Sequence, residues 1–143
     1  MSYEILDDLT CADIAIKVTA KDITGLFFSG AEALLSVLID NPGSIAFKTE
    51  KQIALKNAEI DLLLYGFLNE IIFFKDAESL LLLPKTVNII YTGNEYAVDC
   101  LFHGEHIDRL RHNFNVDVKA VTMHNLKVEN IDDGWIAVFI LDV

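Results

Sequence analysis

The sequence ends on an apolar segment that is followed at once by acidic oxygens. Residues 135–141, Trp-Ile-Ala-Val-Phe-Ile-Leu, form an unbroken apolar run of the kind that is typical of a buried strand. Asp142 and Val143 come directly after it. A side-chain carboxylate and the terminal main-chain carboxylate are therefore expected together at the tip of one strand, whereas an ordinary terminus frays into solvent.

A second apolar run near the start of the chain also follows an aspartate. Residues 14–18, Ile-Ala-Ile-Lys-Val, come directly after Asp13. If the two strands lie side by side, the carboxylates of Asp13, Asp142 and Val143 converge, and they repel one another unless a cation or a proton lies between them. Hard oxygen ligands suit calcium, and also magnesium. The alternative is that Asp13 is a solvated or turn-capping residue and that the last two residues form a frayed acidic tail.

Composition limits the class of protein and of partner. A chain of 143 residues is expected to form a single domain, residues 1–143, and its hydrophobic content of 52% excludes disorder. Twenty-two acidic and eleven basic residues give a net charge of −11, which argues against direct nucleic-acid binding and favours a cation or a basic protein partner. The composition leaves the oligomeric state open.

Location follows from what the sequence lacks. Its apolar stretches are too short or too interrupted to span a bilayer, and residues 1–4, Met-Ser-Tyr-Glu, do not resemble the basic start of a signal peptide. Cys11 and Cys100 are far apart with no CxxC spacing, so we expect reduced, buried thiols. A cytoplasmic location is the simplest expectation.

Periodicity predicts two helices among many strands. Asp22 is the expected N-cap of an amphipathic helix over residues 23–39, and Asn57 the expected cap of a second, largely apolar helix that ends near Phe74. The remaining apolar or alternating segments predict strands. Helices packed on a mostly antiparallel sheet make an α+β domain. The expected strands are residues 3–6, 14–18, 45–56, 80–83, 87–91, 96–102, 116–123, 126–128 and 135–141.

Several short segments, taken in order, resemble the archease family. The resemblance covers nearly the whole chain, including its last residues, and implies an archease-like α+β fold. The segments that carry it are Tyr3-Glu4, Ala12-Asp13-Ile14, residues 21–27, Leu68-Asn69-Glu70, Gly104-Glu105, His112, residues 118–122 and residues 138–143.

The resemblance also implies a function and a ligand set. In archeases an aspartate of the N-terminal motif, the penultimate aspartate and the last residue bind a divalent cation, usually described as calcium. These positions correspond to Asp13, Asp142 and Val143. The family helps a GTP-dependent RNA ligase of tRNA splicing to become guanylylated and to turn over repeatedly. The resemblance therefore implies a ligase activator rather than an enzyme.

The N-terminal motif departs from the family pattern. Where archeases typically carry aspartate, histidine and threonine before the alanine, this chain has Leu9, Thr10 and Cys11. Asp7 and Asp8 lie just upstream, and they are either further ligands or solvated side chains. The departure affects the expected ligase activation more than metal binding, because the ligand positions themselves match. We therefore expect a divergent member of the family.

Other polar residues have two interpretations each. Lys119 either reaches an anionic group near the cation or pairs with an acid such as Asp117 or Asp99. Glu70, on a largely apolar helix, either lines a cleft at the cation site or lies on the solvent-exposed face of the helix. The four histidines lack the spacing of a zinc site, and we expect them to be ordinary surface or core groups. They are His103, His106, His112 and His124.

Two further functional hypotheses remain beside the ligase activator. No GxSxG, Walker A or GxGxxG motif is present, so the sequence predicts no catalytic residues. A small hydrolase dependent on a divalent metal would use the carboxylate site with magnesium and would need a base. A chaperone-like interaction module would recognise its partners through the apolar helix and the acidic face.

Overall fold

The computed structural model describes residues 2–6 and 13–143 and confirms the α+β prediction. Seven strands, two α-helices and one 3-10 turn follow one another in this part of the chain. The strands form two sheets rather than the single sheet that we expected. The elements are β1 (Ser2–Leu6), β2 (Asp13–Ala20), α1 (Ile23–Leu38), η1 (Pro42–Ser44), β3 (Thr49–Asn57), α2 (Ile60–Glu78), β4 (Leu80–Thr92), β5 (Glu95–His106), β6 (Ala120–Ile131) and β7 (Gly134–Asp142).

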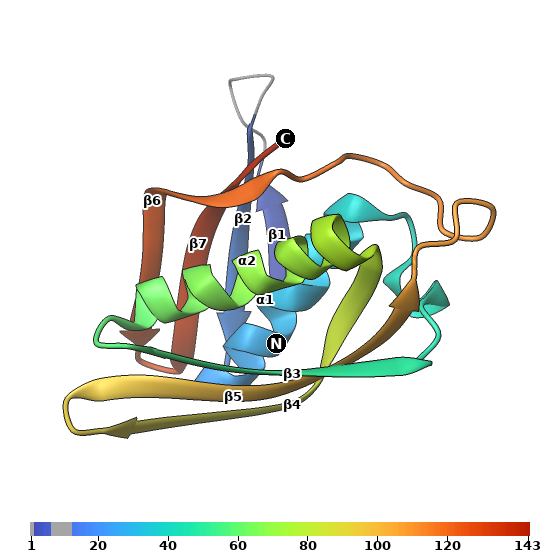
Figure 1. The fold of residues 1–143 in the computed structure, drawn as a ribbon. Helices are drawn as coiled ribbons and strands as arrows, with labels where there is room; N and C mark the ends of the chain where they lie inside the picture. Colours follow the sequence, from blue (N-terminus) through green and yellow to red (C-terminus); the bar gives the residue numbers. More distant parts are fainter. Residues whose placement is uncertain (1, 7–12) are drawn as a thin grey trace.

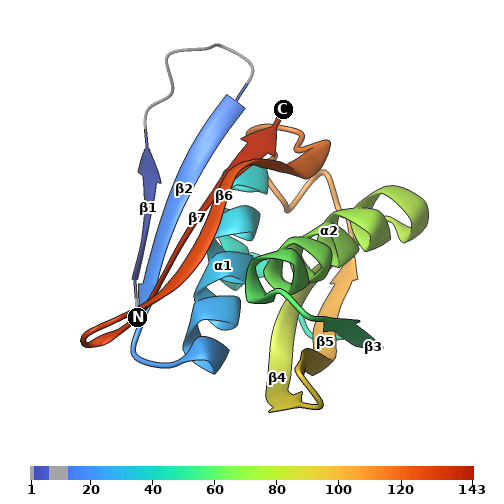
Figure 2. The same ribbon diagram turned by 90° about the vertical axis from the view of Figure 1, so that its left-hand side faces the viewer.

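The two sheets enclose both helices. One sheet has the strand order β1-β2-β7-β6 and the other β3-β5-β4, and every neighbouring pair is antiparallel. Figure 2 shows α1 and α2 lying between the sheets, so each sheet has one face against the helices. The core forms there, and its largest buried rings include Phe27, Phe67 and Phe102. The Phe67 ring of α2 packs at a tilt against Phe27 of α1 and stacks on Phe102 of β5, so it joins α1 to β5.

Helix α1 begins where the sequence predicts. The Asp22 side chain accepts a hydrogen bond of 2.7 Å from the Gly25 backbone N–H, which satisfies one of the free donors at the helix start. Apolar and small residues then cover most of the helix surface, and most of them are buried. The helix ends at Leu38, one residue earlier than expected.

The predicted cap of the second helix is wrong. Asn57 is the last residue of β3, and its side chain accepts a hydrogen bond of 2.9 Å from the Glu59 backbone N–H. Asparagine makes such local turns readily. Helix α2 begins two residues later, after Glu59, and continues to Glu78, past the predicted end near Phe74. Neither helix in the described ranges combines the length and the apolar character that crossing a membrane requires.

Several strand boundaries also differ from the predictions. Residues 45–48 are not part of β3, because the Ala46 and Lys48 backbone N–H groups donate to Glu105 and Gly104 instead of to a regular ladder. The segments 80–83 and 87–91 form one strand, β4, which is irregular between Pro84 and Thr86, where proline lacks a donor. Strand β6 begins only at Ala120, and residues 116–119 precede it.

Candidate metal site

The two predicted aspartates meet. Asp13 is the first residue of β2 and Asp142 the last residue of β7, and the antiparallel register places them directly opposite each other. Side chains of directly opposite residues leave the same face of a sheet with their Cβ atoms about 5 Å apart. Figure 1 shows the C-terminus beside the upper end of β2. The strands that carry Asp13 and Asp142 are therefore neighbours, as the prediction required.

The end of β7 is held from both sides. β7 is an inner strand between β2 and β6, and Asp142 lies opposite Ala120 of β6 as well as opposite Asp13. The Asp142 carbonyl oxygen accepts a hydrogen bond of 2.8 Å from the Lys119 backbone N–H. Val143 is half-buried and packs against the core. The acidic end of the chain is therefore fixed rather than frayed.

Asn69 of α2 fixes the neighbouring edge strand. Its side-chain oxygen accepts from the Val121 backbone N–H at 2.9 Å, and its side-chain nitrogen donates to the Val121 carbonyl at 3.2 Å. The same nitrogen donates to the Tyr65 carbonyl at 3.1 Å. On the open edge of β6, the Asn69 amide thus takes the place of a further strand. Val121 directly follows Ala120, which lies opposite Asp142. The sequence placed Asn69 in a family-like motif but assigned it no role.

Other predicted site residues lie apart or lie outside the described ranges. Asp7 and Asp8, and the departing positions 9–11, fall outside them. The Lys119 side chain is exposed and pairs with neither predicted acid. Asp117 pairs instead with Lys75 at 2.7 Å, and Asp99 accepts from Gln52 at 3.0 Å.

Glu70 and two of the histidines do not join the acidic pair. Glu70 is half-buried on α2 and forms no ion pair with a described residue. The His103 ring stacks on Phe47, and the backbone N–H of His124 donates to the Thr122 hydroxyl at 3.3 Å. Nothing in these contacts assigns either group to a metal.

The chemistry of the donor set suits a hard divalent cation. Two opposed aspartate carboxylates supply only oxygen, which is what calcium and magnesium prefer. Calcium takes six to eight oxygens, so water or further groups would complete its coordination. Within residues 2–6 and 13–143, histidine, cysteine, aspartate and glutamate side chains form no cluster of three that could hold a metal. A site here would therefore need ligands besides the side chains of Asp13 and Asp142.

Comparison with known proteins assigns the family. A family model described as "Archease protein family (MTH1598/TM1083)" matches residues 3–143. The chain belongs to the archease family. "Protein archease" of Pyrococcus furiosus is 32% identical over 133 residues, which cover 92% of this chain and 93% of that protein. "Protein archease" of Methanopyrus kandleri is 31% identical over 132 residues, which cover 92% of this chain and 94% of that protein.

Solved structures share the archease fold. The solution structure of Methanobacterium thermoautotrophicum protein 1598 superposes with a TM-score of 0.83 at 27% identity and covers 99% of this chain and 98% of its own. The crystal structure of "an archease, possible chaperone" from Thermotoga maritima gives a TM-score of 0.63 at 22% identity and supports the fold alone. It covers 94% of this chain and 93% of its own.

The late archease-like motif forms a buried ionic cluster. Glu105 is 3% exposed, and its carboxylate accepts from the Ala46 backbone N–H at 2.6 Å and contacts His112 Nε2 at 2.9 Å. It also accepts from the Arg111 guanidinium. The Asp108 backbone N–H donates to His112 Nδ1 at 2.9 Å, so Nδ1 carries a lone pair and Nε2 carries the proton. A neutral His112 therefore donates to Glu105.

The cluster keeps Glu105 ionised and ties three segments together. The Arg111 hydrogen bond, opposed by burial and aided by Ala46 and His112, lowers the pKa of Glu105 from 4.5 to about 2. The carboxylate is therefore charged at neutral pH and joins β5, the segment before β3 and the loop after β5. The motif is visible in the sequence but the cluster is not, because the Ala46 contact bridges segments that are distant in sequence.

Proposed function

We propose that this chain is a metal-binding accessory protein that promotes the guanylylation and turnover of a GTP-dependent RNA ligase of tRNA splicing. Membership of the archease family supports the class of protein. The single observation that carries the proposal is the pairing of Asp13 with Asp142 next to the last residue of the sequence. An ordinary sheet avoids like charges directly opposite each other, so a pair of this kind suits a cation ligand.

The residues that would hold the cation are the side chains of Asp13 and Asp142 and the terminal carboxylate of Val143. A bound divalent cation would supply positive charge able to polarise a phosphate oxygen. The two strands keep the carboxylates in register, and Lys119 and Asn69 hold the strand ends. The net charge of −11 directs the protein toward a basic surface of the ligase rather than toward RNA.

Assays with purified RNA ligase test whether this protein activates the ligase. The fraction of guanylylated ligase and the number of ligation turnovers are measured with and without this protein, in calcium, in magnesium and in excess chelator. We expect stimulation that needs a divalent cation. Asp142→Ala should abolish it, because this change removes one of the two opposed carboxylates while leaving the backbone ladder in place.

Asp133→Ala is the matched control. Asp133 is exposed in the turn at the opposite end of β7, so the change removes the same charge away from the paired aspartates. It should leave stimulation intact. Guanylylation that is unchanged by a stoichiometric amount of the wild-type protein would remove the ligase role. Equal losses in the two variants would show that net charge, and not the paired site, is responsible.

A metal-independent interaction module is the second candidate. Large apolar side chains such as Phe73 on α2 and Met123 on β6 are more than half exposed, which is a feature of protein-binding surfaces. Stimulation or partner binding that persists in excess chelator and in Asp142→Ala would favour this role over the metal-dependent one.

A further inference from the structure

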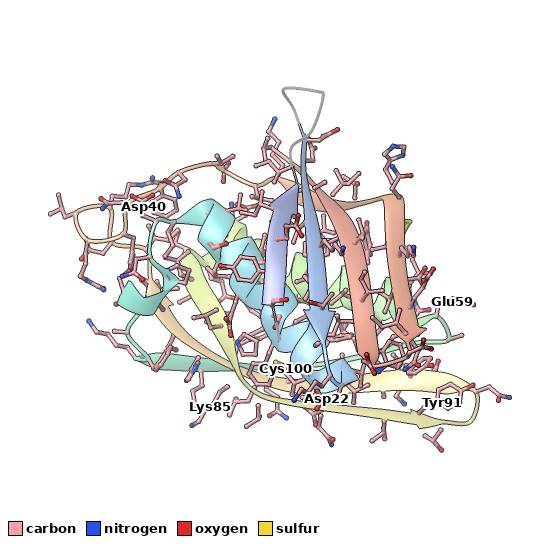
Figure 3. The ribbon with its side chains drawn as sticks, turned by 180° about the vertical axis from the view of Figure 1, so that it is seen from behind. Asp22, Asp40, Glu59, Lys85, Tyr91 and Cys100 are labelled. Carbon is pink, nitrogen blue, oxygen red and sulfur yellow. The ribbon has the colours of Figure 1, made fainter. Side chains whose placement is uncertain are left out.

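A pocket of about 440 Å³ opens on the face of the molecule opposite to α2. Its walls come from β1, α1, η1, the segment after η1, β4 and β5. Figure 3 shows this side, with α1 running between β1 and β4 and with Lys85 labelled at the lower left. Aromatic side chains of Tyr3, Phe28 and Phe47 line the pocket, together with the Glu32 carboxylate. This volume is in the range of small-ligand sites.

The exposed ring of Phe47 is held rigidly. Its side chain is 60% exposed, yet the residues on both sides are fixed: the Ala46 N–H donates to Glu105 and the Lys48 N–H donates to the Gly104 carbonyl at 2.8 Å. The ring stacks on His103 with centroids 3.5 Å apart and planes 2° from parallel. The buried Glu105 cluster thus positions an aromatic wall that the core does not need.

The charges around the pocket favour a cation. Glu32 lies one helical turn after Phe28 on the same face of α1, is exposed and forms no ion pair with a described residue. Burial and nearby Lys85, opposed by Glu50, lower the pKa of His103, which favours the neutral form of its ring. Lys85 is itself paired with Glu50 at 3.0 Å.

We propose that this pocket binds an arginine side chain of a basic partner protein. A guanidinium stacks on aromatic rings and makes paired hydrogen bonds to a carboxylate, and the pocket offers Phe47 for the first contact and Glu32 for the second. Arginine suits this geometry better than lysine, because its charge is planar and weakly hydrated. The overall charge of −11 attracts such a partner.

The pocket is separate from the paired aspartates. Tyr3 lies opposite Val18, which follows Asp13 by five positions in β2. At ~3.3 Å per residue, these two positions of the strand are about 17 Å apart. The arginine proposal therefore goes beyond the metal-dependent function. A test of one does not decide the other.

An NMR titration of the full chain tests the proposal. The probe is Nα-acetyl-arginine methylamide, which mimics an arginine within a protein, and it is compared with the lysine and the citrulline derivatives. Citrulline keeps the shape of the side chain but is neutral. We expect saturable shifts at the amides of Glu32, Phe47 and Leu83, with binding of the citrulline derivative at least about tenfold weaker.

Matched variants locate the contact. Glu32→Gln and Phe47→Ala should each weaken binding several-fold. Glu95→Gln removes an exposed acid of the β4–β5 hairpin, and Phe73→Ala removes an exposed ring of α2; both should leave binding unchanged. Asp142→Ala should also leave it unchanged, which separates this result from any failure of the ligase role.

Several results would overturn the proposal. If the citrulline derivative binds as tightly as the arginine derivative, the pocket does not recognise a positive charge. If the lysine derivative binds as tightly as the arginine derivative, the pocket does not select a guanidinium group. Shifts spread over the acidic surface, with equal losses in Glu32→Gln and Glu95→Gln, would indicate non-specific attraction. Much tighter binding of free arginine than of the blocked derivative would indicate a small-molecule site instead of a partner side chain.

Discussion

Asp13 and Asp142 are direct cross-strand neighbours, although they come from opposite ends of the sequence. The core enforces their register, because Ile16 and Phe139, which are paired three positions further along the same ladder, are fully buried. Shifting the strands by one residue would move these apolar side chains to the other face. The fold therefore keeps two carboxylates opposed whether or not a cation is bound.

Calcium should stabilise the folded protein through this pair. A ligand that binds only the folded state, present at a concentration of about ten times its Kd, adds about 1.4 kcal/mol to the free energy of unfolding. For a domain of this size, that increase raises the Tm by about 5 °C. Asp142→Asn should abolish the calcium-dependent increase. Without calcium its Tm should equal or slightly exceed that of the wild type, because the opposed charges are removed. Differential scanning calorimetry with calcium and with chelator measures both effects.

Two controls make the calcium experiment specific. Asp133→Asn, in the turn at the other end of β7, should keep the full increase. Residues appended after Val143 should reduce it, because they replace the terminal carboxylate with a peptide group. An increase in Tm that survives Asp142→Asn would place calcium elsewhere on this acidic protein.

Local sequence patterns indicate the cap of α1 and the β4–β5 turn, which are formed by residues close together in the sequence. Asp22 caps α1 as predicted. Gly93 and Asn94 join the predicted strands on either side of them through a two-residue turn, with φ values of 60° and 63°. Asp13 precedes and Asp142 follows an apolar run, so their meeting was predicted on the condition that the two strands lie side by side. The local pattern does not decide whether that condition is met.

Features that depend on distant contacts were not predictable in this way. The division into two sheets arises because both helices need apolar faces on two sides, and no local pattern shows which strands share a sheet. The segment 45–48 alternates like a strand, but Glu105 and Gly104 bind its backbone N–H groups. The roles of Asn69 and Glu105 likewise rest on partners in other elements.

Asn69→Ala should loosen the edge strand beside Asp142. The change removes the hydrogen bonds to the Val121 backbone and leaves these groups without their partner, at a cost of about 2 kcal/mol. Amide hydrogen exchange at Val121 should become faster, and calcium binding should weaken, because β6 flanks Asp142. Glu70→Ala, at the next position of α2, should change neither quantity. Unchanged exchange at Val121 in Asn69→Ala would contradict the proposed support.

Glu105 should make stability depend on pH in the acid range. Its pKa falls from 4.5 to about 2 on folding, so its ionised form stabilises the native state above pH 4.5. That contribution is lost as the pH falls from about 4.5 toward 2. Glu105→Gln should lower the free energy of unfolding at pH 7 by about 1.5–3 kcal/mol, because the charged hydrogen bond from the partly exposed Arg111 is lost. The difference between variant and wild type should shrink across this window, as measured by urea unfolding.

The surface ion pair between Lys85 and Glu50 provides the comparison for Glu105. Both side chains are about half exposed, so Glu50→Gln should cost less than about 1 kcal/mol. A Glu105→Gln variant that is no less stable than Glu50→Gln would mean that the buried cluster contributes little. The arginine probe should also bind Glu105→Gln more weakly than wild type, because Phe47 loses one of its flanking anchors.

Two glycines should respond to alanine in opposite ways. A Cβ atom at Gly104 would lie 1.8 Å from the Leu81 carbonyl oxygen, which is backbone and cannot move aside cheaply. Gly104→Ala should therefore destabilise the protein by several kcal/mol or prevent folding. A Cβ atom at Gly66 within α2 would meet Leu55 at an ordinary 3.5 Å. Gly66→Ala should stabilise by about 0.5–1 kcal/mol, since alanine favours helix. Thermal unfolding of the two variants checks both signs.

Cys100 should be inert in the folded protein. Its thiol is fully buried in β5, and burial, with a smaller effect of Asp99, raises its pKa to about 12. Because the thiolate is the reactive form, iodoacetamide at pH 8 should leave Cys100 unmodified for as long as the domain stays folded. Peptide mass spectrometry before and after denaturation in urea measures this directly. Rapid modification of Cys100 in the native protein, at a rate independent of urea, would show that β5 opens readily. It would contradict the packing of this sheet around the Phe102 ring.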